Sequence, residues 1–274
     1  MDSYVDAAPK AHTIEVEPKV VDPTEGPDFV TALARGLTVI RAFGADRPSM
    51  TLADIAKRVS LPRATVRRSL ITLETLGYVE SDGRNFSLSP KVLTLGNSYL
   101  VSSPFPRTIQ PILERLAESS GESCWAAILD DEDVLLVAGA KSNRMLSAGL
   151  RVGSRLPAYC SAFGRVLLSS YSDPELELYL SSIVLRKHTS RTSTDLAAVR
   201  KAIHDARENS YAIADGEVEL GLCSLAVPIT DIRGKIVAAV NTTAPSSRVK
   251  SGEMVERFLP HLRRVAEEIK PVLA

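Results

Sequence analysis

The chain has 274 residues, enough for two domains, and its 45% hydrophobic and 24% charged residues are typical of a globular protein. This composition excludes a wholly disordered chain and a coiled-coil rod, and no run of about 18 apolar residues predicts a membrane span. The 33 basic and 33 acidic residues cancel, but unevenly along the chain. The net charge is −5 over residues 1–28, +5 over 29–100 and zero over 101–274. A basic segment in a neutral chain indicates a partner that carries phosphates.

Residues 1–28 are predicted to form a disordered acidic tail, because they combine four prolines and excess acid with little apolar periodicity. This tail lacks the apolar core of a secretory signal. The three cysteines are scattered and none is in CxxC spacing. We therefore expect a cytoplasmic protein with reduced thiols.

Residues 29–89 predict a winged helix-turn-helix domain. Apolar residues at helical spacing predict a first helix that ends at Gly44, and a second begins at Thr51, three residues before Asp54, in a variant of the capping box. A short turn leads to a third helix, which starts at Pro62 and stops at Gly77. An Asp-Gly turn then joins two predicted strands into a hairpin, the wing. This order is typical of DNA-binding proteins.

The third helix is expected to enter the major groove, and its first turns hold five candidate contact residues: Arg63, Ala64, Thr65, Arg67 and Arg68. These lie largely off the apolar stripe that begins at Val66, so they are free to face DNA. Arg84 and Asn85 follow the wing turn and are expected to touch the flanking backbone. A basic face that is merely solvated is the alternative, and which arginines meet bases rather than phosphates stays open.

Residues 90–103 predict a linker helix and hinge, and residues 104–274 a second, α+β domain. Helical and strand periods alternate here with hairpin-like joins, which favours a mostly antiparallel sheet. The expected helices are 106–120, 161–171, 173–182, 195–210 and 250–273. The expected strands are 123–129, 133–140, 145–150, 211–215, 224–230 and 235–243, with a Gly- and Arg-rich loop after residue 150.

Five segments from residue 35 onward resemble the IclR family of bacterial transcriptional regulators. They are RGLTVIRAF (35–43), TLADIAKRVSLPRATVRRSLITLETLGYV (51–79), VGSRLPAYCSAFGRVLLS (152–169), YAIADGEVELGLCSLAVPI (211–229) and IVAAVNTTAPSSRV (236–249). The RLPAYC stretch resembles the branch that controls β-ketoadipate-pathway genes, in protocatechuate and 4-hydroxybenzoate catabolism. The resemblance implies a GAF-like effector domain, a homodimer or dimer of dimers, operator DNA as a partner and an aromatic carboxylic acid as effector.

The expected effector site combines a helix start with a strand face. Ser161 is a predicted N-cap, and small residues behind it leave room for a ligand. Strand alternation places Asn241 and Thr243 on one face with Val237 and Ala239. The family resemblance carries effector contacts to Ala162, Phe163, Gly164, Ser224, Asn241 and Thr243. Arg144, Arg151 and Arg155 stand upstream and offer charge-assisted contacts to a carboxylate, with solvated arginines as the alternative.

We expect no catalytic residue, cofactor or metal. The sequence lacks a nucleophile elbow, a P-loop and a dinucleotide fingerprint, and its four histidines have no metal-ligand spacing. Cys160-Ser161 is the one nucleophile-like pair, and a small buried thiol beside a helix cap explains it. Three alternatives stay open: a regulator that answers to a non-aromatic acid, a DNA-tethered enzyme, and an architectural DNA-binding protein without a ligand.

Overall fold

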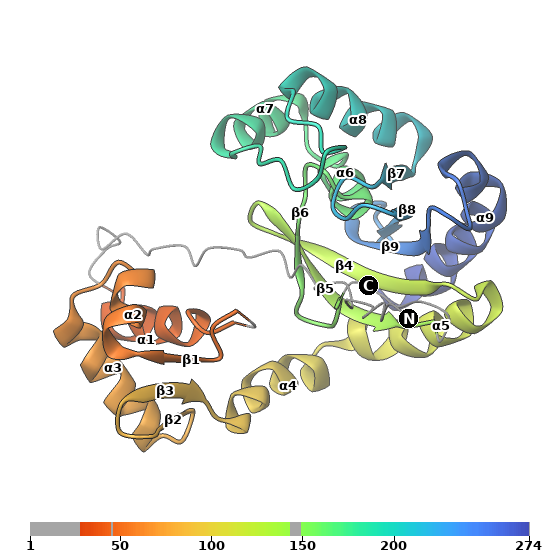
Figure 1. Cartoon of the computed structure of the whole chain (residues 1–274). Coiled ribbons are helices and arrows are strands. Elements are labelled where there is room, and N and C mark those ends of the chain that lie inside the picture. The colour runs from red at the N-terminus through yellow and green to blue at the C-terminus, as the bar shows by residue number, and fades with distance from the viewer. Residues whose placement is uncertain (1–27, 45, 143–148, 274) are drawn as a thin grey trace, which may run out of the picture. The chain divides into compact units, whose positions relative to one another are not determined.

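The computed structural model describes residues 28–44, 46–142 and 149–273 (Figure 1). The acidic tail up to residue 27 lies outside the described residues. The chain divides into two compact units between Ser102 and Ser103. None of the described helices is long and apolar enough to cross a membrane.

The N-terminal unit is a winged helix-turn-helix fold. Its elements are α1 (Thr31–Arg41), β1 (Ser49–Thr51), α2 (Leu52–Arg58), α3 (Arg63–Thr75), β2 (Val79–Ser81) and β3 (Asn85–Leu88). The predicted capping box is confirmed, because the Thr51 hydroxyl accepts from the Asp54 amide while the Asp54 carboxylate accepts from the Thr51 amide. Ile55, Val66 and Leu70 are fully buried and join α2 to α3.

The wing is a three-stranded antiparallel sheet in the order β1-β3-β2. The hairpin of β2 and β3 was predicted, whereas β1 was not, and its last residue, Thr51, was predicted to begin the second helix. Met50 pairs with Phe86 and is buried, so three residues without strand periodicity become a strand through pairing with β3. Thr51 ends this strand and caps α2 at the same time.

The predicted linker helix is a 3-10 turn (Pro90–Val92) followed by α4 (Leu93–Ser102). Its side chains are largely exposed, with Leu93 at 72% and Val101 at 62%. Ser103 alone separates α4 from α5 (Pro104–Ser120), so the helical structure breaks for one residue at the end of the predicted linker.

The C-terminal unit is a six-stranded antiparallel sheet in the order β6-β5-β4-β9-β8-β7, with helices on both faces (Figure 1). Its strands are β4 (Ser123–Asp130), β5 (Asp133–Ala140), β6 (Arg155–Pro157), β7 (Ala212–Asp215), β8 (Leu222–Thr230) and β9 (Ile236–Pro245). Its helices are α5, α6 (Ala162–Leu168), α7 (Asp173–Ser182), α8 (Leu196–Asn209) and α9 (Ser251–Ile269), which a 3-10 turn (Lys270–Val272) follows. The α+β class with an antiparallel sheet is thus confirmed.

Alternate residues along the strands supply two separate cores. Cys124, Ala126 and Val240 face α5 and α9 in one core. Trp125 and Ala239 face α6, α7 and α8 in the other, which we call the α6 face. Both faces of the sheet are covered, and this explains why the strands are apolar at consecutive positions.

Two details of the sheet differ from expectation. β6 lies where a loop was predicted, at the edge next to β5, a position that tolerates Pro157 because an edge strand has free N–H positions. The pairing of β8 with β9 contains a bulge. Ile229 pairs with Ala238, but the next residue, Thr230, pairs with Ile236, so Val237 has no partner on β8 and the alternation of faces is interrupted there. At this point of β9, Ile236 packs against the α6 face. The expected strand 145–150 lies mostly outside the described residues, and residues 149 and 150 are not in a strand.

Candidate functional site

The exposed face of α3 carries the predicted DNA contacts. Arg63, Ala64, Arg67 and Arg68 are exposed and Thr65 is half-buried, while the opposite stripe of α3 is in the core. Within the described residues, the guanidinium groups of Arg63, Arg67 and Arg68 form no ion pair. Three positive side chains without an acidic partner leave their donors available to phosphates and base edges.

The two wing residues differ in their surroundings. The Asp82 carboxylate accepts from the backbone amides of Arg84 and Asn85 and from the Asn85 side chain, which holds the turn at Gly83. These hydrogen bonds hold the pKa of Asp82 below its ordinary value. Arg84 is exposed. The side-chain amide of Asn85 thus helps to hold the shape of the wing, and Arg84 places an exposed positive charge at its turn.

The start of α6 is buried. The Ser161 hydroxyl accepts from the Gly164 amide at 3.1 Å, which confirms the predicted N-cap. Ala162 and Phe163 are 2% and 1% exposed and belong to the α6 face core. A Cβ at Gly164 would lie 2.0 Å from the Ala158 carbonyl oxygen. Glycine at this position is therefore required by the close approach of two backbone segments.

Three polar side chains form a row on the sheet opposite α6, which packs on β8 and β9. The Asn241 side-chain amide donates to the Thr243 hydroxyl at 3.0 Å, and the Thr243 and Ser224 hydroxyls lie 2.8 Å apart. Asn241 and Thr243 are both 3% exposed. We call Ser224, Asn241 and Thr243 the polar row. The predicted strand alternation is confirmed here, because Ala239 and Ala226 on the same face lie in the α6 face core.

The carbonyl oxygen of the Asn241 side chain has no hydrogen-bond partner among the described residues, although it is fully buried. A buried acceptor without a donor loses the hydrogen bonds that water would give it. Such an atom is rare in a folded protein.

Sequence reasoning missed Trp125 at this site. Trp125 lies directly across from Asn241 in the register of β4 and β9, is 3% exposed, and faces α6. Its indole lies over Gly139 of β5, where a Cβ would come within 2.0 Å of the ring. The ring therefore occupies the space that the absent side chain of Gly139 leaves on β5, the strand on the other side of β4 from β9. The single tryptophan of the chain was the available signal.

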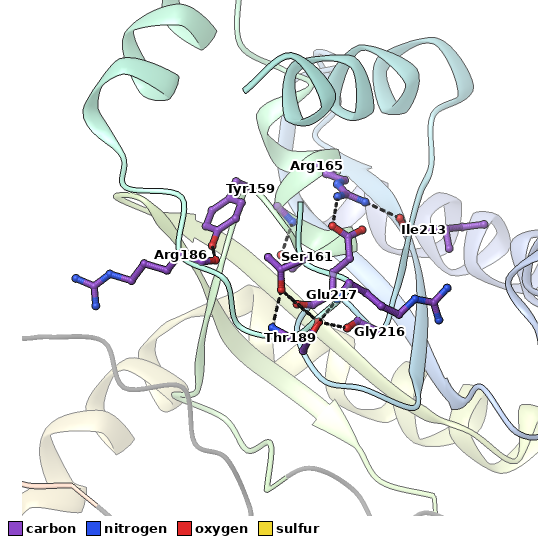
Figure 2. Close-up of polar contacts among 11 residues, drawn as sticks. Tyr159, Ser161, Arg165, Arg186, Thr189, Ile213, Gly216 and Glu217 are labelled. Carbon is purple, nitrogen blue, oxygen red and sulfur yellow. Dashed lines mark hydrogen bonds and ion pairs between the residues drawn. The ribbon is translucent and has the colours of Figure 1, made fainter. Parts of the chain in front are cut away.

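Sequence reasoning also missed a buried ion pair beside the α6 start. Arg165, which is 8% exposed, pairs with Glu217 at 2.7 Å and donates to the Ile213 carbonyl at 2.9 Å. Figure 2 shows this pair next to Thr189, whose hydroxyl donates to the Gly216 carbonyl. These contacts fasten α6 to the turn between β7 and β8 and to the segment that precedes α8.

The three arginines predicted near the effector differ in their interactions and exposure. Arg155 forms ion pairs with Asp130 and with Asp133, the latter at 3.2 Å, which tie β6 to the hairpin of β4 and β5. Arg151 is exposed. Arg144 lies outside the described residues.

The cysteines are all buried. Burial raises the pKa of Cys160 to about 12 and those of Cys124 and Cys223 to about 11, so their thiols stay protonated. No group of three His, Cys, Asp or Glu side chains in the described part of the chain is arranged to hold a metal ion.

Comparisons with known proteins match both units. Residues 32–83 match the IclR helix-turn-helix domain, and residues 97–271 match the C-terminal domain of bacterial IclR transcriptional regulators. The Pca regulon regulatory protein of Pseudomonas putida is 44% identical over 247 residues, 90% of this chain and 85% of that protein. A transcriptional regulator of Rhodococcus sp. RHA1 superposes with a TM-score of 0.77 and 41% identity over 89% of this chain and 98% of that chain. An IclR homologue of Microbacterium hydrocarbonoxydans, crystallised with 4-hydroxybenzoate, superposes with a TM-score of 0.73 and 28% identity over 88% and 98%.

Proposed function

We propose that this chain, which belongs to the IclR family of bacterial transcriptional regulators, controls genes for aromatic-acid breakdown in response to a small aromatic carboxylic acid. The family membership makes it a DNA-binding regulator rather than an enzyme. The aromatic effector is supported by two relatives, the Pca regulon regulator and the homologue crystallised with 4-hydroxybenzoate.

In this proposal α3 enters the major groove of the operator. Its arginines Arg63, Arg67 and Arg68, which form no ion pair with any described residue, meet bases and phosphates. Ala64 and Thr65 lie in the same first turns and approach the base edges. Arg84 reaches the flanking phosphates from the wing, which Asn85 holds in shape.

The observation that carries the effector site is the buried polar row on an otherwise apolar sheet face under α6. An aromatic acid needs flat apolar walls for its ring and a few placed polar groups for its substituents. Trp125 and Phe163 supply apolar surface, and the polar row supplies hydrogen-bonding groups. Ser161 caps α6, the helix that packs on β8 and β9, and Ala162 and Gly164 lie in its first turn.

The regulator is proposed to act as a homodimer or a dimer of dimers. Leu33 and Leu37, one helical turn apart on α1, are 62% and 49% exposed, and α4 exposes Leu93 and Val101 as well. Exposed apolar side chains at helical spacing favour burial against a second copy. The effector then shifts the population of DNA-binding arrangements, because it binds one arrangement better than the other.

The effector site is tested by Ala162→Leu, with Ala197→Leu as the matched control. Both alanines occupy the first turn of a helix in the same unit, but Ala162 is buried at the site and Ala197 is exposed on α8. We expect Ala162→Leu to abolish binding of protocatechuate and 4-hydroxybenzoate by steric exclusion, and Ala197→Leu to bind like the parent. Calorimetric titration measures both, and circular dichroism checks the fold.

Binding by a folded Ala162→Leu variant with the affinity of the parent would place the effector elsewhere. If neither acid binds the parent while a non-aromatic acid does, the effector class is wrong and the regulator assignment stands. If no acid of either class binds, the chain is a DNA-binding protein without an effector.

A further inference from the structure

We propose that the acidic tail, residues 1–28, docks on the exposed basic face of α3 and competes there with operator DNA. The carboxylates of the tail take the place of the DNA phosphates on this face. The proposal goes beyond effector control, because it gives the chain a second restraint on DNA binding that needs no effector. It rests on the proposed role of α3 as the helix that contacts DNA.

The tail and the DNA-binding unit carry opposite charges in a chain that is neutral as a whole. The net charge is −5 over residues 1–28, +5 over 29–100 and zero over 101–274. Most of the negative charge lies next to the DNA-binding unit, because residues 15–28 hold five acidic residues and one lysine, a net charge of −4. Charge complementarity therefore selects the N-terminal unit, and not the neutral effector unit, as the docking surface.

The receiving surface is a group of arginines that the fold leaves without acidic neighbours. Arg63, Arg67 and Arg68 are exposed on α3 and form no ion pair with any described residue. Arg155 and Arg200 in the effector unit, by contrast, are paired with carboxylates. A guanidinium group binds a carboxylate and a phosphate with the same donors. The face of α3 that suits DNA thus also suits an acidic segment of the same chain.

The tail is long enough to reach this face from its point of attachment. Asp28 is the first described residue, and α1, which begins at Thr31, packs against α3. The 13 residues of α3 make a helix about 20 Å long. Residues 15–27 can span at most about 43–47 Å when extended, so their carboxylates can meet arginines along the whole helix.

The covalent connection makes weak contacts sufficient. A tethered segment meets its binding surface at an effective concentration of about 1 mM, whereas each exposed ion pair contributes little by itself. Because salt screens exposed charges, the restraint should be strong at low salt and fade as the salt concentration rises. The tail also lies outside the residues that match the two IclR domains, 32–83 and 97–271, so the restraint belongs to this chain and not to the shared domains.

The first experiment compares the operator affinity of the full-length parent with that of a full-length variant whose tail is neutralised. The neutralised variant carries Glu15→Gln, Glu17→Gln, Asp22→Asn and Glu25→Gln. The matched control removes the same number of charges from exposed carboxylates of the effector unit, with Glu118→Gln, Glu208→Gln, Glu256→Gln and Glu267→Gln.

We expect the neutralised variant to bind operator DNA about three- to ten-fold more tightly than the parent at about 50 mM salt. The ratio should approach one at about 300 mM salt, because the ion pairs of the docked tail are then screened. The control should stay close to the parent at both salt concentrations. Fluorescence anisotropy of labelled operator DNA, recovered by selection from random sequences, measures all three proteins.

The second experiment locates the docking surface. A labelled peptide of residues 1–28 is titrated at low salt with the neutralised full-length variant, whose α3 face is free of the tail. A three- to ten-fold restraint at about 1 mM effective concentration corresponds to a dissociation constant of about 0.1–0.5 mM for this peptide. Adding Arg67→Ala and Arg68→Ala should weaken peptide binding several-fold. Adding Arg107→Ala and Arg233→Ala, at two exposed arginines of the effector unit, should leave it unchanged.

Four results would overturn the proposal while DNA binding itself stands. Equal operator affinity of the parent and the neutralised variant at low salt shows that the tail does not occupy the DNA-binding face. Weaker binding by the neutralised variant shows that the tail assists DNA binding. An equal gain in the control shows a diffuse effect of net charge without docking. Peptide binding that survives the loss of Arg67 and Arg68 places the docking surface elsewhere. Failure of the parent and the variants to select any DNA sequence contradicts instead the role of α3 in DNA binding.

Discussion

Adding one methyl group at Gly164 should destabilise the effector unit. The Cβ of Gly164→Ala would lie 2.0 Å from the Ala158 carbonyl oxygen and 2.2 Å from the Ala158 Cα. Both are backbone atoms, so no side-chain rotation relieves the clash, and α6 has to move away from residue 158. Overpacking of this kind costs about 1–3 kcal/mol, which exceeds the gain of about 0.5–1 kcal/mol that alanine brings to a helix.

Gly252→Ala is the matched control. Gly252 also lies in the first turn of a helix, α9, but a Cβ there meets nothing within 4 Å. We expect a small gain or no change in the unfolding free energy for this variant, against a net loss of about 1–2 kcal/mol for Gly164→Ala.

Urea unfolding followed by Trp125 fluorescence measures both variants, because the single tryptophan lies in the same core as α6. In thermal unfolding each kcal/mol corresponds to about 2–4 °C for a unit of this size. A Gly164→Ala variant as stable as Gly252→Ala would refute the reasoning, since α6 and residue 158 would then not be in backbone contact.

Three further predictions concern DNA binding, the buried ion pair and the thiols. Arg67→Ala and Arg68→Ala should each weaken operator binding by about 1–3 kcal/mol. Where the lost contact is to a phosphate, the slope of log affinity against log salt concentration should also fall by about one. Variants that bind the operator like the parent across a salt series would contradict this prediction. Glu217→Gln should lower the unfolding free energy by about 3–5 kcal/mol, because it leaves the buried Arg165 charge without its ion-pair partner. The double variant Glu217→Gln with Arg165→Met should lose less stability than the sum of the two single variants. Strictly additive losses in denaturant unfolding would exclude the coupling. The three thiols, with pKa values raised to about 11–12, should resist a thiol-specific reagent at about pH 8 until the protein unfolds, and rapid labelling of native protein speaks against their burial. Unfolded thiols lose their protons from about pH 8.5, so the unfolded state binds fewer protons above this pH and stability should fall as the pH rises from there toward 12.

Local chemistry was readable from the sequence wherever neighbours along the chain decide the structure. The Thr51–Asp54 capping box and the Ser161 cap join residues three apart, and both are present as expected. Alternation along β9 placed Asn241 and Thr243 on one face correctly, because no bulge interrupts that stretch.

What the sequence did not reveal depends on contacts between distant segments. β1 and β6 are three residues long and exist through their pairing with β3 and β5. The Arg165–Glu217 pair joins positions 52 residues apart, and no local pattern predicts it. Trp125 is read as an ordinary apolar strand residue until the register of β4 and β9 places it across from Asn241.

The affinity for operator DNA, measured with and without effector, tests the central claim most directly. The operator is recovered by selection from random DNA, and the effector is whichever of protocatechuate and 4-hydroxybenzoate binds the parent more tightly. We predict that the acid changes the DNA affinity of the parent by about five-fold or more, and that Ala162→Leu keeps its DNA affinity but loses this response. A parent whose DNA affinity ignores the bound acid, or an Ala162→Leu variant that responds like the parent, would contradict the account.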